Sequence, residues 1–325
     1  MPNLSLYDLA VLQRNDPYTG LIEDVTTLPR EFTTIASVKR PGTWYEIVRR
    51  ITLPTAQFRP VNQGVTPSRS TYKKEIKEML FIDTQIQMDE AVWDADDNSV
   101  GAAWQLEAAG AMQSLGILIG QQTYYGTGAD AYGFNGIRTQ LAAVAKANGT
   151  TNTTSAYLLW ENEKEGIRYD VGKDGNFAIS APMRQQIADP NNSGKYLFAY
   201  VGNLKGYVGL FVGSNLSAYA VTGITTTVTA PATNGLSDAI AMQLFASVPI
   251  ARRNSMRWYM NRTAEAILQQ NRSAITPSTG SGANGLAQYQ PADGSGRPAF
   301  APTPEKLLGW DIVVTDSILN TETNS

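Results

Sequence analysis

The sequence predicts an α+β fold with two long elements, a β-hairpin and one long helix, within a chain otherwise dominated by strands. Three observations predict it. Residues 44–88 contain two runs rich in β-branched and aromatic residues around a turn-rich stretch. Residues 99–125 carry apolar side chains at helical spacing. Short β-rich runs fill residues 157–224, separated by Gly, Pro and Asn.

The first segment, residues 1–43, shows little amphipathic periodicity. Prolines interrupt it at four positions: Pro2, Pro17, Pro29 and Pro41. Such a segment has nothing of its own to pack against, so we expect an extended arm that is either disordered or held by a neighbouring chain.

The hairpin is predicted from two extended runs. The run WYEIVRRITL begins at Trp44 and ends before Pro54, and the second run extends from about Tyr72 to Met88. Within the second run, apolar and polar residues alternate from Ile82 to Met88, the period of a half-buried strand. A long isolated hairpin is barely stable in water, so it requires a partner surface.

Charge is segregated along this region. Residues 39–77 carry nine Lys or Arg against two Glu, whereas residues 78–97 carry seven acidic groups and no basic one. One interpretation is an ordinary solvated charge run. The other is a basic loop that docks on an acidic surface of another subunit. The candidate inter-subunit residues are Arg49, Arg50, Arg59, Arg69, Lys73, Lys74, Lys77, Asp89, Glu90, Asp94, Asp96 and Asp97.

The long helix is predicted over about residues 99–125. Its apolar stripe runs along one face at alternating spacings of four and three: Trp104, Ala108, Ala111, Leu115 and Leu118. Gly116 and Gly120 lie four residues apart, so one flank of the helix is expected to accept close backbone approach. We refer to this element as the spine helix.

The rest of the chain is expected to consist of short helices and strands. A short helix is predicted over residues 137–147, and about six strands between Tyr157 and Ile224. Ser237 is expected to cap a helix that reaches Val248, and Asn261 a second helix after the strand RWYM. Residues 273–305 are dense in Gly, Ser and Pro, which predicts a long surface loop. The run LLGWDIVVTDSI is expected to return a strand to the main sheet.

Composition limits the chemistry. The chain has no His and no Cys, which excludes Ser-His-Asp and Cys-His catalysis and imidazole or thiolate metal sites. Carboxylate or lysine chemistry stays open. The net charge of −3 argues against a basic nucleic-acid footprint, and no run of apolar residues is long enough to span a membrane. Charged residues make up only 17%, fewer than a soluble monomer usually displays, which indicates surface covered by another chain. We expect a self-associating protein without cofactors that is not an enzyme.

The order of these parts resembles the major capsid proteins of tailed bacteriophages, which have the HK97-type fold. The resemblance is carried by LPTAQFRPVNQGVTPSRSTYKKEIKEMLFIDTQIQMDEAVW, RWYMNRTAEAILQQN and GWDIVVTDSI. It implies an N-terminal arm, a long β-hairpin called the E-loop, a spine helix in a peripheral domain, and an axial domain. The implied boundaries are residues 1–43 for the arm, 44–95 for the E-loop and acidic turn, 96–235 for the peripheral domain, 236–305 for the axial domain, and 306–325 for the returning strand.

The resemblance also implies a function. Hexamers and pentamers of such a subunit would close an icosahedral head around double-stranded DNA, with a scaffolding protein, a portal and, as an open point, a decoration protein as partners. The subunit would be made in the cytoplasm of a host bacterium and reside in the virion. Two alternatives stay open: a bacterial nanocompartment shell of the encapsulin type, and a carbohydrate-binding or carbohydrate-active β protein. The latter would use exposed aromatics such as Tyr157, Trp160, Tyr196, Tyr200 and Tyr207.

Overall fold

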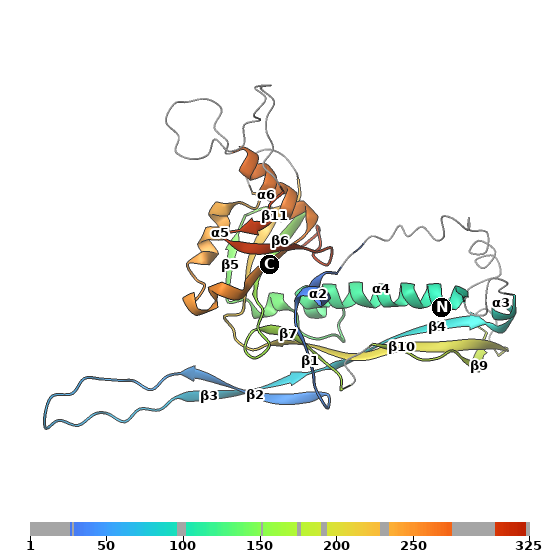
Figure 1. The fold of residues 1–325 in the computed structure, drawn as a ribbon, viewed down its shortest axis with the longest axis horizontal. Coiled ribbons are helices and arrows are strands. Elements are labelled where there is room, and N and C mark those ends of the chain that lie inside the picture. The colour runs from blue at the N-terminus through green and yellow to red at the C-terminus, as the bar shows by residue number, and fades with distance from the viewer. Residues whose placement is uncertain are drawn as a thin grey trace, which may run out of the picture.

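The structure is a computed structural model, and it describes residues 27, 29–95, 102–150, 152–173, 177–189, 194–227, 234–274 and 303–322. Figure 1 shows three parts: a long helix lying along a sheet, a compact α/β unit at one end of that helix, and a hairpin that projects away from both.

The first sheet lies along the spine helix. Its strand order is β1 (Ser37–Lys39), β7 (Ile167–Val171), β10 (Tyr196–Val212) and β4 (Leu80–Asp89), and β8 (Ala178–Ile179) and β9 (Met183–Ala188) also pair with β10. The spine helix is α4 (Ala102–Tyr125), which runs parallel to β4 and β10 in Figure 1. Its Trp104 packs with Ile86 and Met88 of β4. A Cβ on Gly202 of β10 would lie 2.6 Å from the Trp104 ring, so only glycine admits this contact.

The second sheet forms the compact unit. Its order is β13 (Lys306–Leu307), β14 (Trp310–Val314), β12 (Met256–Met260), β6 (Thr153–Trp160), β11 (Ala218–Thr225) and β5 (Ala143–Lys146). Helices α5 (Asp238–Phe245) and α6 (Arg262–Ala274) supply apolar side chains to its core. Three short 3-10 helices join these elements: η1 (Gly126–Gly128), η2 (Ile137–Gln140) and η3 (Ile250–Ser255). Both predicted caps are confirmed, since the Ser237 hydroxyl accepts from the Ile240 amide and the Asn261 carbonyl from the Ala264 amide.

The hairpin is a two-stranded sheet of β2 (Trp44–Thr52) and β3 (Thr71–Glu78). The prediction that residues 72–88 form one strand of it was wrong. The extended run divides at the buried Met79, and β4 continues as the partner of β10 in the body. The division occurs because Ile82, Ile86 and Met88 supply an apolar face to the body, whereas β3 is mostly charged.

Part of the expected arm packs on the body, which corrects the expectation that it has no partner within the chain. Helix α2 (Glu31–Thr34) buries Glu31, whose carboxylate accepts from the hydroxyls of Tyr124, Thr315 and Ser317. Strand β1 then pairs in parallel with β7. The residues before Pro29 other than Thr27 lie outside the described part of the chain.

Three further predictions differ from the structure. Residues 137–147 form η2 and then β5, because the Ala-rich run pairs with β11 in preference to closing a helix. The runs KYLFAYV and YVGLFV join into the single strand β10, and the polar β9 was not predicted. The returning strand is confirmed as β14, which pairs with β12. Most of the loop predicted over residues 273–305 lies outside the described residues.

The close approach expected at the glycine flank is present at Gly120. A Cβ there would lie 2.2 Å from Ser317 Oγ and 3.0 Å from Pro29, whereas at Gly110 of the same helix it would meet nothing within 4 Å. We expect Gly120→Ala to lower the free energy of unfolding by about 1–3 kcal/mol through overpacking. Gly110→Ala should raise it by about 0.5–1 kcal/mol, because alanine favours the helix. Urea unfolding of both variants tests this, and equal effects would contradict the contact.

Candidate functional site: the β2–β3 hairpin and its base

The outer face of the hairpin exposes large apolar side chains. The cross-strand register places Trp44 opposite Glu78, Val48 opposite Lys74, and Tyr72 opposite Arg50. The apolar members of this face are all well exposed: Trp44, Val48, Tyr72 and Ile76. An exposed apolar surface of this kind is typical of protein interaction sites.

The tip of the hairpin, residues 53–70, is more exposed still. Phe58 has a relative exposure of 107%, which means that no part of the described chain covers it. Leu53, Val61 and Val65 are also exposed. Figure 1 shows this tip reaching past the rest of the molecule, at the opposite end from α3 (Glu90–Asp94). Any surface that covers the tip therefore lies outside the described residues of this subunit.

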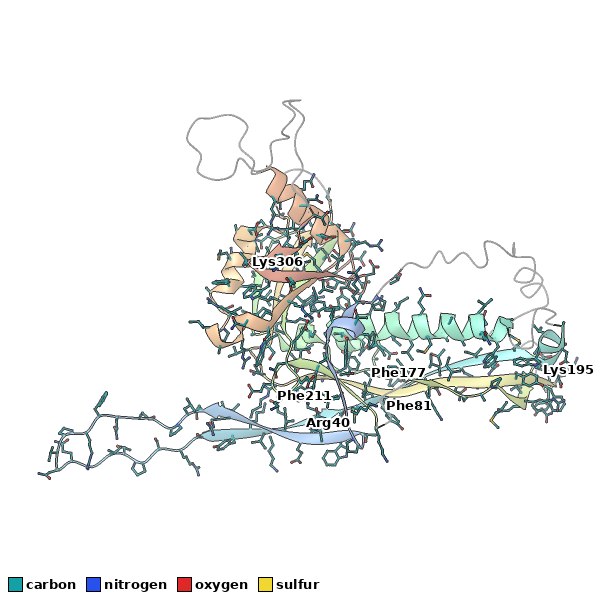
Figure 2. The ribbon with its side chains drawn as sticks, viewed as in Figure 1. Arg40, Phe81, Phe177, Lys195, Phe211 and Lys306 are labelled. Carbon is teal, nitrogen blue, oxygen red and sulfur yellow. The ribbon has the colours of Figure 1, made fainter. Side chains whose placement is uncertain are left out.

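The base of the hairpin is tied to the body through Asp170 of β7. Its carboxylate accepts from the Tyr45 hydroxyl of β2 and from Arg168 Nε at 2.8 Å, and Arg40 lies 3.9 Å away. Burial, and then the hydrogen bond to Asp170, raises the pKa of the Tyr45 phenol, which keeps it protonated as a donor. Figure 2 shows Arg40 together with Phe211 where the hairpin passes the body. This polar cluster fixes the hairpin at its base.

Two of the predicted basic candidates also act at this base. Arg49 forms an ion pair with Glu75 at 3.1 Å, and it donates to the Val212 carbonyl at 3.1 Å and to Asn215 in the body. Lys77 lies 3.6 Å from Glu75 and is largely buried. Burial lowers the pKa of Lys77, and the charge of Glu75 opposes that shift. Arg49 thus attaches the hairpin to the body, whereas Lys77 forms its ion pair within β3.

The other five basic candidates remain at the surface of the hairpin. Lys73 and Lys74 have exposed side chains that pair with Glu75 at 3.5 Å and Glu46 at 3.1 Å. Arg50 lies over the Tyr72 ring, with its guanidinium carbon 5.6 Å from the ring centroid. Arg59 and Arg69 lie in the exposed tip, where Arg59 donates to the Gln63 carbonyl at 2.8 Å. Exposed pairs of this kind contribute little to folding, so these cations stay available to a partner.

The acidic candidates lie at the far end of the molecule. Asp89 caps α3 by accepting from the Ala91 amide at 2.8 Å, and Glu90 pairs with Arg184 at 2.6 Å. The hydrogen bond from Arg184 lowers the pKa of Glu90. Asp94 is exposed at the end of α3. Asp96 and Asp97 lie outside the described residues. Figure 1 places α3 and the hairpin tip at opposite ends, so the two charged groups cannot meet within one subunit.

The sequence predicted charged residues as the inter-subunit contacts and did not predict the exposed apolar residues of the hairpin. Trp44, Val48 and Phe58 were treated only as strand or turn residues, although they are the most distinctive exposed groups of the hairpin. The signal that could have found Trp44 and Val48 is the pattern within WYEIVRRITL, which places apolar residues on both faces of a strand. A two-stranded sheet buries both of its faces only when other protein surfaces pack against them.

Other candidate chemistry finds no support in the described residues. There, no group of three or more Asp or Glu side chains is placed to hold a metal ion. No described helix is long and apolar enough to cross a membrane. Of the aromatics named for a carbohydrate surface, Tyr157 and Trp160 are buried in the core, Tyr200 is half-buried, and Tyr196 and Tyr207 are exposed.

Comparison with known proteins decides the family. Residues 41–324 match the family described as Major capsid protein GP7. The chain belongs to this family. The GP7 match starts just before β2 and ends near the C-terminus, so it includes the hairpin, the spine helix, the second sheet and all of the first sheet except β1. No curated protein matches the chain.

Solved structures agree with the GP7 assignment. A chain of bacteriophage Epsilon15 matches with a TM-score of 0.68 and 19% identity, covering 99% of this chain and 97% of that one. More distant matches include Mycobacterium phage Adephagia, with a TM-score of 0.46, 11% identity and coverage of 65% and 92%. An encapsulin complex of Synechococcus elongatus matches with a TM-score of 0.44, 9% identity and coverage of 68% and 96%. The chain is thus a tailed-phage major capsid protein with the HK97-type α+β fold, as its sequence pattern indicated.

Proposed function

We propose that this capsid protein assembles into hexamers and pentamers that close an icosahedral phage head around double-stranded DNA. The observation that carries the proposal is the hairpin. It has apolar side chains on its outer face, a tip that no described residue covers, and a polar base that fixes it to the body. Such an element contributes little to the fold of one subunit, and its exposed face suits a neighbouring subunit.

The arrangement of the ends supports assembly into rings. The basic hairpin and the acidic α3 region lie at opposite ends of one subunit. A contact between two different surfaces of the same protein is heterologous, and it generates a closed ring when the rotation between neighbours closes. Because hexamers and pentamers are such rings, we infer that the cations of each hairpin face the next subunit.

The remaining assignments follow from the family. We propose the division given by the sequence: an arm over 1–43, the E-loop over 44–95, a peripheral domain over 96–235, an axial domain over 236–305, and a returning strand over 306–325. The subunit would act as a structural protein of the virion after synthesis in a bacterial cytoplasm. A scaffolding protein and a portal would be partners, a decoration protein stays open, and contact with packaged DNA would be non-specific.

Expression with and without the scaffolding protein tests the proposal. We expect sedimentation to show capsomers or closed particles, and electron microscopy to show shells with five-fold and six-fold clusters. The reason is that exposed apolar surface on the hairpin is removed from water only in the assembled state. A chain that stays monomeric under all these conditions would refute the proposal. Shells that enclose a protein cargo and never DNA would favour the nanocompartment alternative.

A further inference from the structure

The described part of the arm, residues 29–40, crosses the junction between the spine helix, the first sheet and the compact unit. Figure 1 shows its helix α2 at the end of α4 nearest the compact unit. It contacts all three parts: Pro29 lies against Gly116 of α4, Phe32 stacks on Tyr169 of β7, and the Thr34 hydroxyl lies 2.7 Å from the Tyr259 hydroxyl of β12. We call residues 29–40 the strap.

Hydroxyl groups line the surface on which the strap lies. The Glu31 carboxylate is fully buried, and it accepts from the hydroxyls of Tyr124 at 2.9 Å, Thr315 at 2.6 Å and Ser317 at 3.1 Å. Removing a carboxylate from water costs free energy, which hydrogen bonds to neutral groups offset only in part. If the strap leaves, water can replace Glu31 on all three hydroxyls, because protein–water hydrogen bonds are nearly as favourable as those they replace. This surface therefore suits a segment that leaves and returns.

The regular elements of the strap are short. Helix α2 has four residues, and β1 has three and lies at the edge of its sheet. At the two ends of β1, the Tyr169 amide donates to the Ala36 carbonyl and the Arg40 amide donates to the Val171 carbonyl, each at 2.9 Å. Short elements at an edge open at a lower free energy than the core of the same domain.

The end of the strap meets the base of the hairpin. Arg40 is separated from β2 only by residues 41–43. Its guanidinium carbon lies 4.9 Å from the centroid of the Tyr45 ring, and its Nε lies 3.9 Å from Asp170. Asp170 accepts from the Tyr45 hydroxyl of the hairpin, and its backbone pairs with Val38 of the strap. The hairpin and the strap therefore share one attachment point on β7.

We propose that residues 29–40 are a releasable strap that fastens the compact unit to the spine helix, and that a hairpin held in place at Asp170 keeps the strap closed. In the closed state Glu31 lies on its three hydroxyls, and in the open state water takes its place. A partner shifts such an equilibrium only if it favours one state over the other. A partner that fixes the hairpin does so, because Tyr45 and Arg40 share Asp170. The strap belongs to the single subunit, whereas its control by a neighbouring subunit rests on the proposed function.

Hydrogen exchange of the unassembled subunit, followed by mass spectrometry of its peptides, tests the strap. The reporters are the amides of Arg40 and Tyr169, which bond across the edge of β1. We expect them to exchange at least about a hundredfold faster than the amides of β6, all of whose residues are buried. Equal protection of the strap and β6 would overturn the inference, because the strap would then open only when the whole subunit unfolds.

Thr315→Val removes one donor to the buried Glu31 carboxylate without changing the size of the side chain. A hydrogen bond to a charged group contributes enough that we expect exchange of the reporter amides to rise at least about tenfold, while β6 stays protected. Thr321→Val is the matched control, since Thr321 is exposed in the same C-terminal segment, and it should leave exchange unchanged. Equal exchange in the two variants would show that Glu31 does not hold the strap.

Tyr45→Phe tests the link between the hairpin and the strap. It removes the hydroxyl that donates to Asp170, so we expect exchange at Arg40 to rise about fivefold or more in the free subunit. In assembled particles of the parent chain, exchange at Arg40 should be slower than in the free subunit. If Tyr45→Phe has no effect, or if exchange in particles equals that in the subunit, the link to the hairpin is wrong and the capsid function stands. If the parent chain forms no particles, the proposed function itself fails, and exchange in the subunit still decides the strap.

Discussion

Reversal of four exposed charges on the hairpin is expected to abolish particle formation while the subunit still folds. The changes are Arg59→Glu, Arg69→Glu, Lys73→Glu and Lys74→Glu. All four side chains are solvent-exposed, and Lys73 and Lys74 make only surface ion pairs, which contribute little to stability. Across an interface with acidic groups, however, like charges cost several kcal/mol, which corresponds to at least about a hundredfold loss of association. Sedimentation of the assembly reaction measures the loss, and circular dichroism checks the fold.

A charge-preserving variant is the matched control for this reversal. It exchanges Arg59 and Arg69 for Lys, and Lys73 and Lys74 for Arg, so the hairpin keeps its positive charge. We expect it to assemble like the parent chain. Since salt screens exposed charges, assembly of the parent should also weaken at high ionic strength. Normal particles from the reversed variant would refute docking of the hairpin through charge.

The elements that the sequence predicted well are those specified by local pattern. The spine helix is confirmed over Ala102–Tyr125, where Trp104 and Leu115 of the predicted stripe are buried, and the caps at Ser237 and Asn261 follow from side chains that satisfy free amides. Strand β2 of the hairpin follows from its β-branched and aromatic residues. Each of these depends on neighbours within a few residues, so the chain itself carries the information.

The elements that were predicted wrongly depend on distant partners. The run AVAK at Ala143–Lys146 has helical composition, but it becomes a strand because β11 offers a free edge beside it. The split at Met79 arises because β4 pairs with β10, more than a hundred residues later in the sequence. The pattern of residues within one strand does not indicate which other strand of the chain it pairs with.

In the candidate site, too, features with a local sequence pattern were predicted and features that depend on distant residues were not. Charge segregation was visible in the sequence, and it identified the hairpin and the acidic turn. The sequence alone did not show that Arg49 and Lys77 are committed to Glu75, or that Asp170 holds the hairpin base. The contacts of Tyr45 with Asp170 and of Arg49 with Val212 join β2 to the body, so they follow from the tertiary arrangement. The apolar tip was missed because exposure cannot be read from composition.

Loss of Arg168 is expected to be the most damaging single change to the attachment of the hairpin. Arg168 and Asp170 form a buried ion pair at 2.8 Å, and each side chain is only 3% exposed. Arg168 also lies over the Phe211 ring, with its guanidinium carbon 3.5 Å from the ring centroid. Arg168→Leu leaves the Asp170 carboxylate buried without its close cation. We expect the free energy of unfolding to fall by about 3–5 kcal/mol, measured by urea unfolding of the unassembled subunit.

The reason for that cost can be separated from the loss of packing. A triple variant, Arg168→Leu with Asp170→Leu and Tyr45→Phe, removes the buried charges and the hydroxyl that depends on them. Because an apolar replacement of a whole buried pair is often close to neutral, it should be more stable than Arg168→Leu alone. Lys306→Ala removes one member of an exposed pair and should change stability by less than about 1 kcal/mol. A triple variant less stable than Arg168→Leu would show that Asp170 and Tyr45 stabilise the hairpin base through contacts that do not need Arg168, such as the approach of Arg40 to Asp170. In that case the uncompensated charge on Asp170 would not be the cause of the loss.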